Sequence, residues 1–73
     1  MMTPVQRWSH NARRLKELAR QAGHEPMVEE FDNPLSGPTK RVYCVHCGQY
    51  GLAWLRGGRN AGKLRMRCTR QKG

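Results

Sequence analysis

Three cysteines constrain the fold of this short chain more than any other feature. Cys44 and Cys47 form a Cys-x2-Cys motif that Gly48 follows, and Cys68 comes later in the chain. Two thiolates at this spacing can converge on one metal ion, and the glycine permits the tight turn that points backbone N–H groups at the sulfurs. An odd number of cysteines suits a disulfide framework poorly. The spacing therefore predicts a metal site, and thiolate ligands favour zinc over hard cations.

A closed structural zinc site needs a fourth ligand, and the chain offers three histidines. His46 lies inside the motif, where its side chain is expected to point away from the ion. His10 lies within a predicted helix, far along the chain from the cysteines. His24 follows the glycine at which that helix is expected to end, so we favour it and keep His46 and His10 as alternatives. The predicted zinc ligands are His24, Cys44, Cys47 and Cys68.

The length of the chain gives such a site a role in folding. A chain of 73 residues forms one small domain that buries only about 60% of its unfolded surface, so its core alone is marginally stable. A structural zinc contributes on the order of 10–16 kcal/mol near neutral pH. Because an ordinary domain is stable by about 5–15 kcal/mol, metal binding and folding are expected to be one event.

The first segment carries the signals of an amphipathic helix. Thr3 fits the N-cap position, Pro4 fits the first helical position, and Gln6 completes a capping box. Gly23 suits the helix end because it can adopt the left-handed conformation. We therefore predict a helix over residues 4–22. Six apolar residues recur at spacings of three and four and share one face: Val5, Trp8, Ala12, Leu15, Ala19 and Ala22.

The remainder of the chain is expected to be strand and loop. Residues 25–40 contain three prolines and four acidic residues, and they predict an acidic connector without a long regular element. Residues 41–68 are expected to hold the zinc knuckle and a β-hairpin with a glycine-rich turn over 57–62, and residues 69–73 a basic tail. The predicted strands are Arg41–Cys44, Gly51–Arg56 and Lys63–Cys68. The sequence thus predicts a single α+β domain over 1–73, with the helix packed on a short three-stranded antiparallel sheet.

The charge of the chain is positive and unevenly distributed. Lys and Arg total 14 against 5 for Asp and Glu, a formal net charge of +9, and residues 35–73 contain nine basic side chains and no acidic one. Alternation along the last predicted strand is expected to turn its basic residues to solvent and Leu64 and Met66 to the core. A positive surface attracts polyanions, and guanidinium groups suit phosphates and base stacking. The predicted nucleic-acid contacts are Arg56, Arg59, Lys63, Arg65, Arg67, Arg70 and Lys72.

These features predict a zinc-binding protein that recognises DNA or RNA through a basic hairpin face. Tyr43, Tyr50 and Trp54 are candidate stacking partners for unpaired bases. The alternative is a protein-interaction module or inhibitor that binds an acidic surface of a host protein. The stripe of the helix is also compatible with a dimer seam, but core packing and a monomer are the preferred interpretation.

No catalytic arrangement is predicted, and the chain is expected not to be an enzyme. The zinc deaminase signature requires His-x-Glu and Pro-Cys-x-x-Cys, whereas Glu25 follows His24 directly and Tyr43 precedes the first cysteine. The sequence also fits G-x4-G-K, but Leu64 stands where a phosphate-binding loop needs Ser or Thr. The chain shows no apolar run of the length of a signal peptide or membrane span, so a cytoplasmic protein without membrane contact is expected.

The order of these elements resembles a known group of proteins. A Gly-His pair after an N-terminal helix, a Cys-x2-Cys-Gly knuckle and one late cysteine look like the small single-zinc proteins common in bacteriophages of actinobacteria. The resemblance covers roughly residues 23–68 and implies a small phage regulatory protein that acts in the host cytoplasm. The knuckle and hairpin are also similar to half of a zinc ribbon, a group in which nucleic-acid binding is common. The second Cys-x2-Cys of a ribbon is missing, and only Cys68 takes its place.

Overall fold

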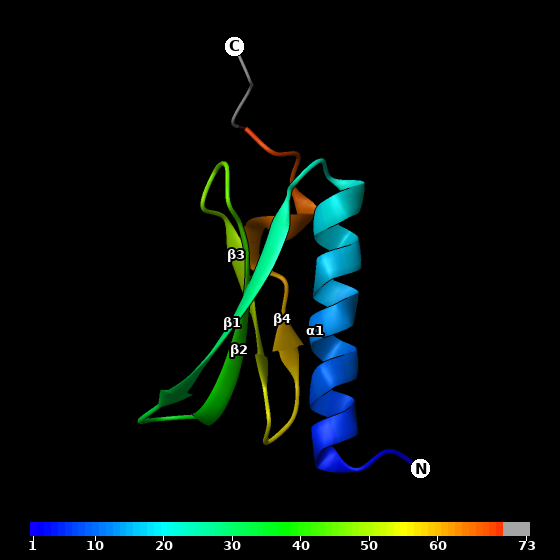
Figure 1. Cartoon of the computed structure of the whole chain (residues 1–73), viewed down its shortest axis with the longest axis vertical. Helices are drawn as coiled ribbons and strands as arrows, with labels where there is room; N and C mark the ends of the chain where they lie inside the picture. The colour runs from blue at the N-terminus through cyan, green and yellow to red at the C-terminus, as the bar shows by residue number, and fades with distance from the viewer. Residues whose placement is uncertain (70–73) are drawn as a thin grey trace.

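The computed structural model describes residues 1–69 and shows one helix packed on one antiparallel sheet (Figure 1). The sheet has four strands in the order β1-β2-β3-β4, so the predicted α+β architecture is confirmed with one strand more than predicted. The elements are α1 (Pro4–Gln21), β1 (Pro26–Asn33), β2 (Gly37–Cys44), β3 (Tyr50–Trp54), β4 (Arg59–Asn60) and the 3-10 helix η1 (Gly62–Arg65).

The helix α1 begins at the residue that its capping signals predict. The N–H of Gln6 donates to Oγ1 of Thr3 at 3.1 Å, and the N–H of Thr3 donates to Oε1 of Gln6 at 2.9 Å. Both halves of the predicted capping box are therefore present. The helix ends at Gln21, one residue before the predicted end.

Substitution of the N-cap residue tests the stabilisation that this capping box provides. We expect Thr3→Ala to lower the free energy of unfolding by about 1 kcal/mol, because the backbone N–H of Gln6 loses its side-chain acceptor. Urea denaturation of the metal-loaded protein, followed by far-ultraviolet circular dichroism, measures the change. Thr3→Ser keeps the hydroxyl and should match the parent within about 0.5 kcal/mol. An equal loss in both variants would contradict the capping role.

The hydrophobic core lies between α1 and the face of the sheet that α1 covers. The indole Nε1 of Trp8 donates to the carbonyl of Ala53 in β3 at 2.9 Å, which ties the helix to the sheet. Val5 was predicted on the same helix face but is 58% exposed, because it lies at the margin of that face. The buried cluster consists of Trp8, Ala12, Leu15, Ala19, Val42, Ala53 and Leu64.

The prediction of an irregular acidic connector over residues 25–40 was wrong. The segment forms β1, a turn and the first half of β2. Its prolines lie where a missing N–H is tolerated. Pro26 starts β1, Pro34 lies in the turn, and Pro38 lies at the start of β2, before the residues of β2 that pair with β3. β1 is an edge strand that is largely exposed on both faces. It therefore lacks the alternation of apolar and polar residues that reveals a half-buried strand.

The strand predicted over residues 63–68 is also absent. The chain forms η1 there, and Leu64 is fully buried while Met66 is 61% exposed. The two side chains therefore do not share the core face that a strand would give them. The reason is that the chain turns back toward the end of α1, where the N–H of Cys68 donates to the carbonyl of Ala22 at 2.9 Å. Because of this path, residues 63–68 do not pair with β3 as a strand.

The hairpin between β3 and β4 turns earlier than predicted. Gly57 and Gly58 both have positive φ, and Arg59 already pairs with Ala53 of β3. The predicted turn over residues 57–62 therefore contains β4 itself. The strand predicted over residues 51–56 corresponds to β3, and the one over 41–44 is the second half of β2.

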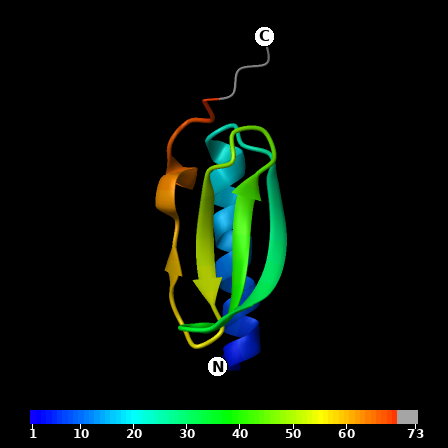
Figure 2. The same cartoon turned by 90° about the vertical axis from the view of Figure 1, so that its left-hand side faces the viewer.

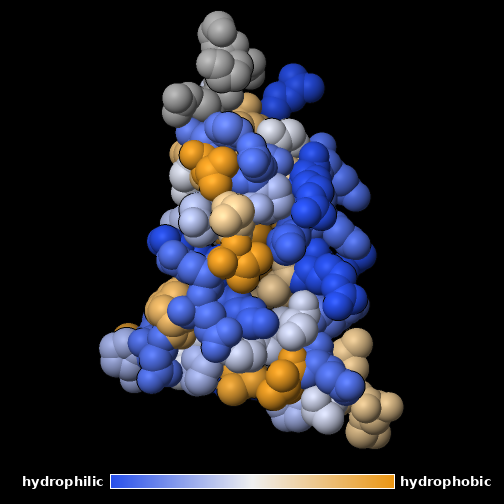
Figure 3. Space-filling model, in the orientation of Figure 1, coloured by the Kyte–Doolittle hydropathy of each residue, from blue (hydrophilic) through white to orange (hydrophobic). Residues whose placement is uncertain are grey.

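α1 covers one face of the sheet and leaves the opposite face open. Figure 2 looks onto this open face, with α1 behind the sheet and no other described element in front of it. In the orientation of Figure 1, hydrophobic residues reach the surface in the middle of the molecule, and strongly hydrophilic residues gather over α1 (Figure 3). Because α1 lies behind the sheet in Figure 2, the open face is a solvent-facing surface of the described chain.

Candidate metal centre

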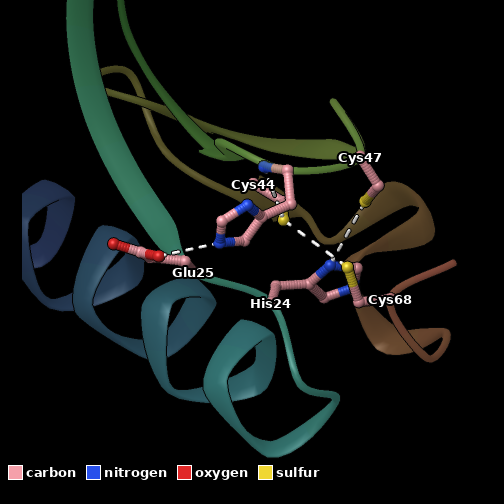
Figure 4. Close-up of polar contacts among 6 residues, drawn as sticks. His24, Glu25, Cys44, Cys47 and Cys68 are labelled. Carbon is pink, nitrogen blue, oxygen red and sulfur yellow. Dashed lines mark hydrogen bonds and ion pairs between the residues drawn. The ribbon is translucent and has the colours of Figure 1, made fainter. Parts of the chain in front are cut away.

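The four residues predicted as zinc ligands lie together at the end of the molecule where α1 and β2 end (Figure 4). Their ligand atoms all lie within 4.8 Å of one another. His24 follows α1, Cys44 ends β2, Cys47 lies in the next turn, and Cys68 follows η1. Segments far apart in the sequence therefore meet at one point, and the cluster could hold one metal ion.

The distances within the cluster suit ligands that share an ion. The Sγ atoms of Cys44 and Cys68 are 3.8 Å apart, far beyond the roughly 2.05 Å of a disulfide bond. The Sγ of Cys47 lies 3.4 Å from Nδ1 of His24. His24, Cys44 and Cys68 are buried and Cys47 is half-buried. Burial limits the access of competing water to the cluster.

The turn after β2 has the local geometry that its sequence predicts. The N–H of Gly48 donates to the carbonyl of Cys44 at 3.0 Å, and Gly48 has a φ of +80°, which favours glycine. The N–H of His46 points at Sγ of Cys44 at 3.4 Å. This turn places both cysteines on one side and supplies a backbone donor to a sulfur.

Backbone donors also decide the charge state of the Cys44 thiol. Burial by itself would raise its pKa. Hydrogen bonds from the backbone of Cys47, Glu25 and His46, together with the His24 side chain, outweigh burial and lower the pKa of Cys44 from 9.0 to about 5. Because the thiolate is the form that binds metal, Cys44 is in its ligating state at neutral pH.

The end of α1 aims His24 into the cluster. Gly23 has a φ of +85°, which lets the N–H of His24 bond back to the carbonyl of Ala19 at 2.9 Å. Nε2 of His24 lies 2.7 Å from the carbonyl oxygen of Met66. Because a carbonyl only accepts, Nε2 carries the proton and Nδ1 presents its lone pair to the cluster. This carbonyl contact cannot be predicted from residue types, because every residue carries the same backbone carbonyl.

The other two histidines lie outside this cluster. Nε2 of His46 is 2.8 Å from a carboxylate oxygen of Glu25, and Figure 4 shows that contact beside the sulfurs. His10 lies on α1. The structure therefore brings His24 to the cysteines, in agreement with the favoured prediction. The contact between His46 and Glu25 was missed because Glu25 precedes β1 and His46 follows β2, so the two residues are 21 positions apart in the sequence.

The basic residues predicted to bind nucleic acid gather at one edge of the sheet. The described ones are all exposed: Arg56, Arg59, Lys63, Arg65 and Arg67. We call these five residues the basic edge. Arg59 also donates to Oδ1 of Asn11 on α1 at 2.6 Å, and together with Arg65 and Trp54 it lines a cavity of about 450 Å³. Arg70 and Lys72, the other two predicted contacts, lie outside the described residues.

Comparisons of the chain with protein-family models, with curated proteins and with solved structures give no match. Function therefore has to be argued from the geometry of the cluster and from the charges and side chains around it. Over residues 1–69, no helix combines the length and the apolar character needed to cross a membrane.

Proposed function

We propose that this chain is a small zinc-stabilised module that binds nucleic acid and has no catalytic activity. Three thiolates and one imidazole are a ligand set typical of structural zinc sites. Tetrahedral zinc with bonds of about 2.3 Å to sulfur and about 2.0 Å to nitrogen places two sulfurs about 3.8 Å apart, and sulfur and nitrogen about 3.5 Å apart. The observed separations of 3.8 Å and 3.4 Å support zinc. Four protein ligands leave no open position for a substrate.

The observation that carries the nucleic-acid proposal is the separation of charge across the sheet. The strand order places β1, with Glu29, Glu30 and Asp32, at one edge and β4 at the other. The basic edge surrounds β4 and η1. Among residues 1–69, the ion pairs of acidic residues are with Arg14, Arg41 and His46. None of the basic edge is neutralised by these pairs, so it presents uncompensated positive charge to solvent.

A phosphate backbone is the partner that suits such a surface. Four of the five residues of the basic edge are arginines, whose planar guanidinium groups bind phosphate oxygens in pairs. DNA and RNA both offer this chemistry. The resemblance to small single-zinc phage proteins supports a regulatory protein that acts in the cytoplasm of a bacterial host, and the packing of the α1 stripe in the core supports a monomer. The second candidate, a module that binds an acidic surface of a host protein, uses the same charges and is separated by the experiment below.

Neutralisation of the basic edge tests the proposal. The triple variant Lys63→Gln, Arg65→Gln, Arg67→Gln should bind a short mixed-sequence DNA or RNA at least about 10-fold more weakly. If the parent uses about six phosphate contacts, its affinity falls about 10³-fold between 50 and 200 mM salt. The triple variant should reduce the slope of log affinity against log salt by about 2–3. Fluorescence anisotropy of labelled oligonucleotides across a salt series measures both quantities.

A matched variant separates a located surface from net charge. Arg7→Gln, Arg13→Gln, Arg20→Gln removes the same charge from exposed positions of α1 and should change the slope by less than half as much. Equal effects of the two variants would show that net charge alone drives binding. A parent protein that binds no oligonucleotide at about 50 mM salt would reject nucleic-acid binding and favour the protein-binding candidate. Zinc content and circular dichroism confirm that each variant is folded.

A further inference from the structure

The aromatic residues of this chain are placed in an unusual way. The chain has five of them, and Trp8 is the one that lies in the buried cluster. The other four lie on the sheet: Phe31 on β1, Tyr43 on β2, and Tyr50 and Trp54 on β3. A small domain with a marginal core would be expected to bury such residues, since each can bury 150–250 Å². Their position therefore needs another explanation.

Register and alternation place these four side chains on the open face. Tyr43 is opposite Tyr50, and Thr39 is opposite both Phe31 and Trp54. Successive residues of a strand point to opposite faces. Because Val42 and Ala53 are buried under α1, their strand neighbours Tyr43 and Trp54 point to the other side, which no described element covers (Figure 2).

An arginine that is ion-paired with Glu29 of β1 lies among these rings. The guanidinium of Arg41 is 5.2 Å from the ring centroid of Tyr43 and 5.6 Å from that of Tyr50. Tyr50 is 48% exposed, so part of its ring is available to a ligand. Interleaved aromatic and cationic side chains suit the flat faces of nucleobases.

A cavity joins the ring of Tyr50 to the basic edge. It has a volume of about 390 Å³, and its lining includes Gln49, Tyr50, Leu52, Asn60 and Lys63. Gly51 lets the chain after β4 pack closely against β3 at this edge, since a Cβ on residue 51 would lie 2.7 Å from the carbonyl oxygen of Asn60. The cavity thus offers a ring for stacking, two amides for hydrogen bonds and an ammonium group for a phosphate.

We propose that the open face binds the unpaired bases of a single-stranded nucleic acid, with Tyr50 as a stacking platform and Lys63 as a phosphate contact. This inference rests on the proposed function and names its substrate class. The phosphate backbone follows the basic edge, and the bases lie over β3, on the side of the sheet away from acidic β1. In a duplex, the bases stack on one another and their flat faces are covered, so a stacking platform selects unpaired bases.

Substitution of Tyr50 tests the proposal on the zinc-loaded protein. The probes are a mixed-sequence single-stranded DNA, the RNA of the same sequence and the matching DNA duplex. We expect the parent to bind a single strand more tightly than the duplex. Tyr50→Ala should weaken single-strand binding about 10-fold and leave duplex binding unchanged, and Tyr50→Phe, which keeps the ring, should restore the affinity. Val5→Ala removes a similarly exposed side chain from α1 and should have no effect.

The other outcomes overturn the proposal and separate it from the proposed function. If the oligonucleotides bind with a steep salt dependence but Tyr50→Ala has no effect, or the duplex binds more tightly, the stacking site is rejected and nucleic-acid binding stands. If the parent binds none of the three probes, both proposals fail. If Tyr50→Ala abolishes a concentration-dependent dimer seen by analytical ultracentrifugation, the open face is a contact between copies of the chain. Equal losses in Tyr50→Ala and Tyr50→Phe would also reject stacking.

Discussion

Removal of zinc by a strong chelator is expected to unfold this chain and to leave at most residual helix in α1. The cluster joins the end of α1, the turn after β2 and the segment after η1. Without the ion, three thiols and an imidazole would be packed together with no shared partner. A structural zinc contributes on the order of 10–16 kcal/mol, which is comparable with the whole stability of an ordinary domain. Near-ultraviolet circular dichroism and dispersion of amide NMR signals should both collapse on chelation and return when zinc is added.

Two histidine variants form a matched control for this prediction. His24→Asn removes a residue of the cluster and should cost tight zinc binding and the folded state together. His46 lies between Cys44 and Cys47 in the turn after β2, but its ring contacts Glu25. His46→Asn should therefore keep one zinc per chain and the folded spectrum. Substitution of zinc by Co²⁺, whose visible absorption reports tetrahedral coordination, checks the ligand geometry. A folded tertiary structure after verified loss of all metal would contradict the prediction.

Truncation of Leu64 is expected to destabilise the metal-loaded protein by about 2–5 kcal/mol. Its side chain is fully buried and belongs to the cluster that α1 and the sheet enclose. Leu64→Ala removes this buried side chain and leaves a cavity that the surrounding structure fills only in part. Because the core of a domain of this size is small, the loss is a large share of its stability. Urea denaturation with zinc in excess measures the change.

Met66 supplies the matched control, two residues along the same segment. Met66→Ala should change the free energy of unfolding by less than about 1 kcal/mol, since its side chain is 61% exposed. A strand over residues 63–68 would bury both side chains on one face and make both variants costly. Similar losses in the two variants would therefore contradict the 3-10 helix and favour the strand. The Met66 carbonyl that contacts His24 is a backbone group and is retained in this variant.

Residues whose role is set by their immediate neighbours were predicted correctly. The capping box depends on Thr3 and Gln6 alone, and both hydrogen bonds are present. The turn around Gly48 depends on the Cys-x2-Cys-Gly motif. His24 was favoured because Gly23 ends the helix, and the structure places His24 beside the cysteines. The capping box and the turn at Gly48 rest on contacts within a few residues along the chain, whereas the meeting of His24 with the cysteines joins segments more than 20 residues apart.

Elements that depend on distant partners were predicted less well. The alternation over residues 63–68 is that of a strand, but the return of Cys68 to the end of α1 imposes another path. β1 lacks a strand pattern because it is exposed on both faces at a sheet edge. Its pairing with β2 across the turn at residues 34–36 stabilises it instead, and no alternation of apolar and polar residues along β1 reveals this pairing. Propensity and period are weak guides where tertiary contacts decide the outcome.

The sequence by itself predicted the helix α1, a metal site at the three cysteines with His24 as the favoured fourth ligand, and the excess of basic over acidic residues. These properties follow from side-chain chemistry and from backbone geometry over a few residues. Only the tertiary structure decided where the charges and the aromatic residues lie. Strand order moved acidic β1 and the basic edge to opposite sides of the sheet, and register turned Tyr43, Tyr50 and Trp54 to the open face. The sheet pairs consecutive strands, but their register and the face that α1 buries are set by packing between elements, which has no local signature in the sequence.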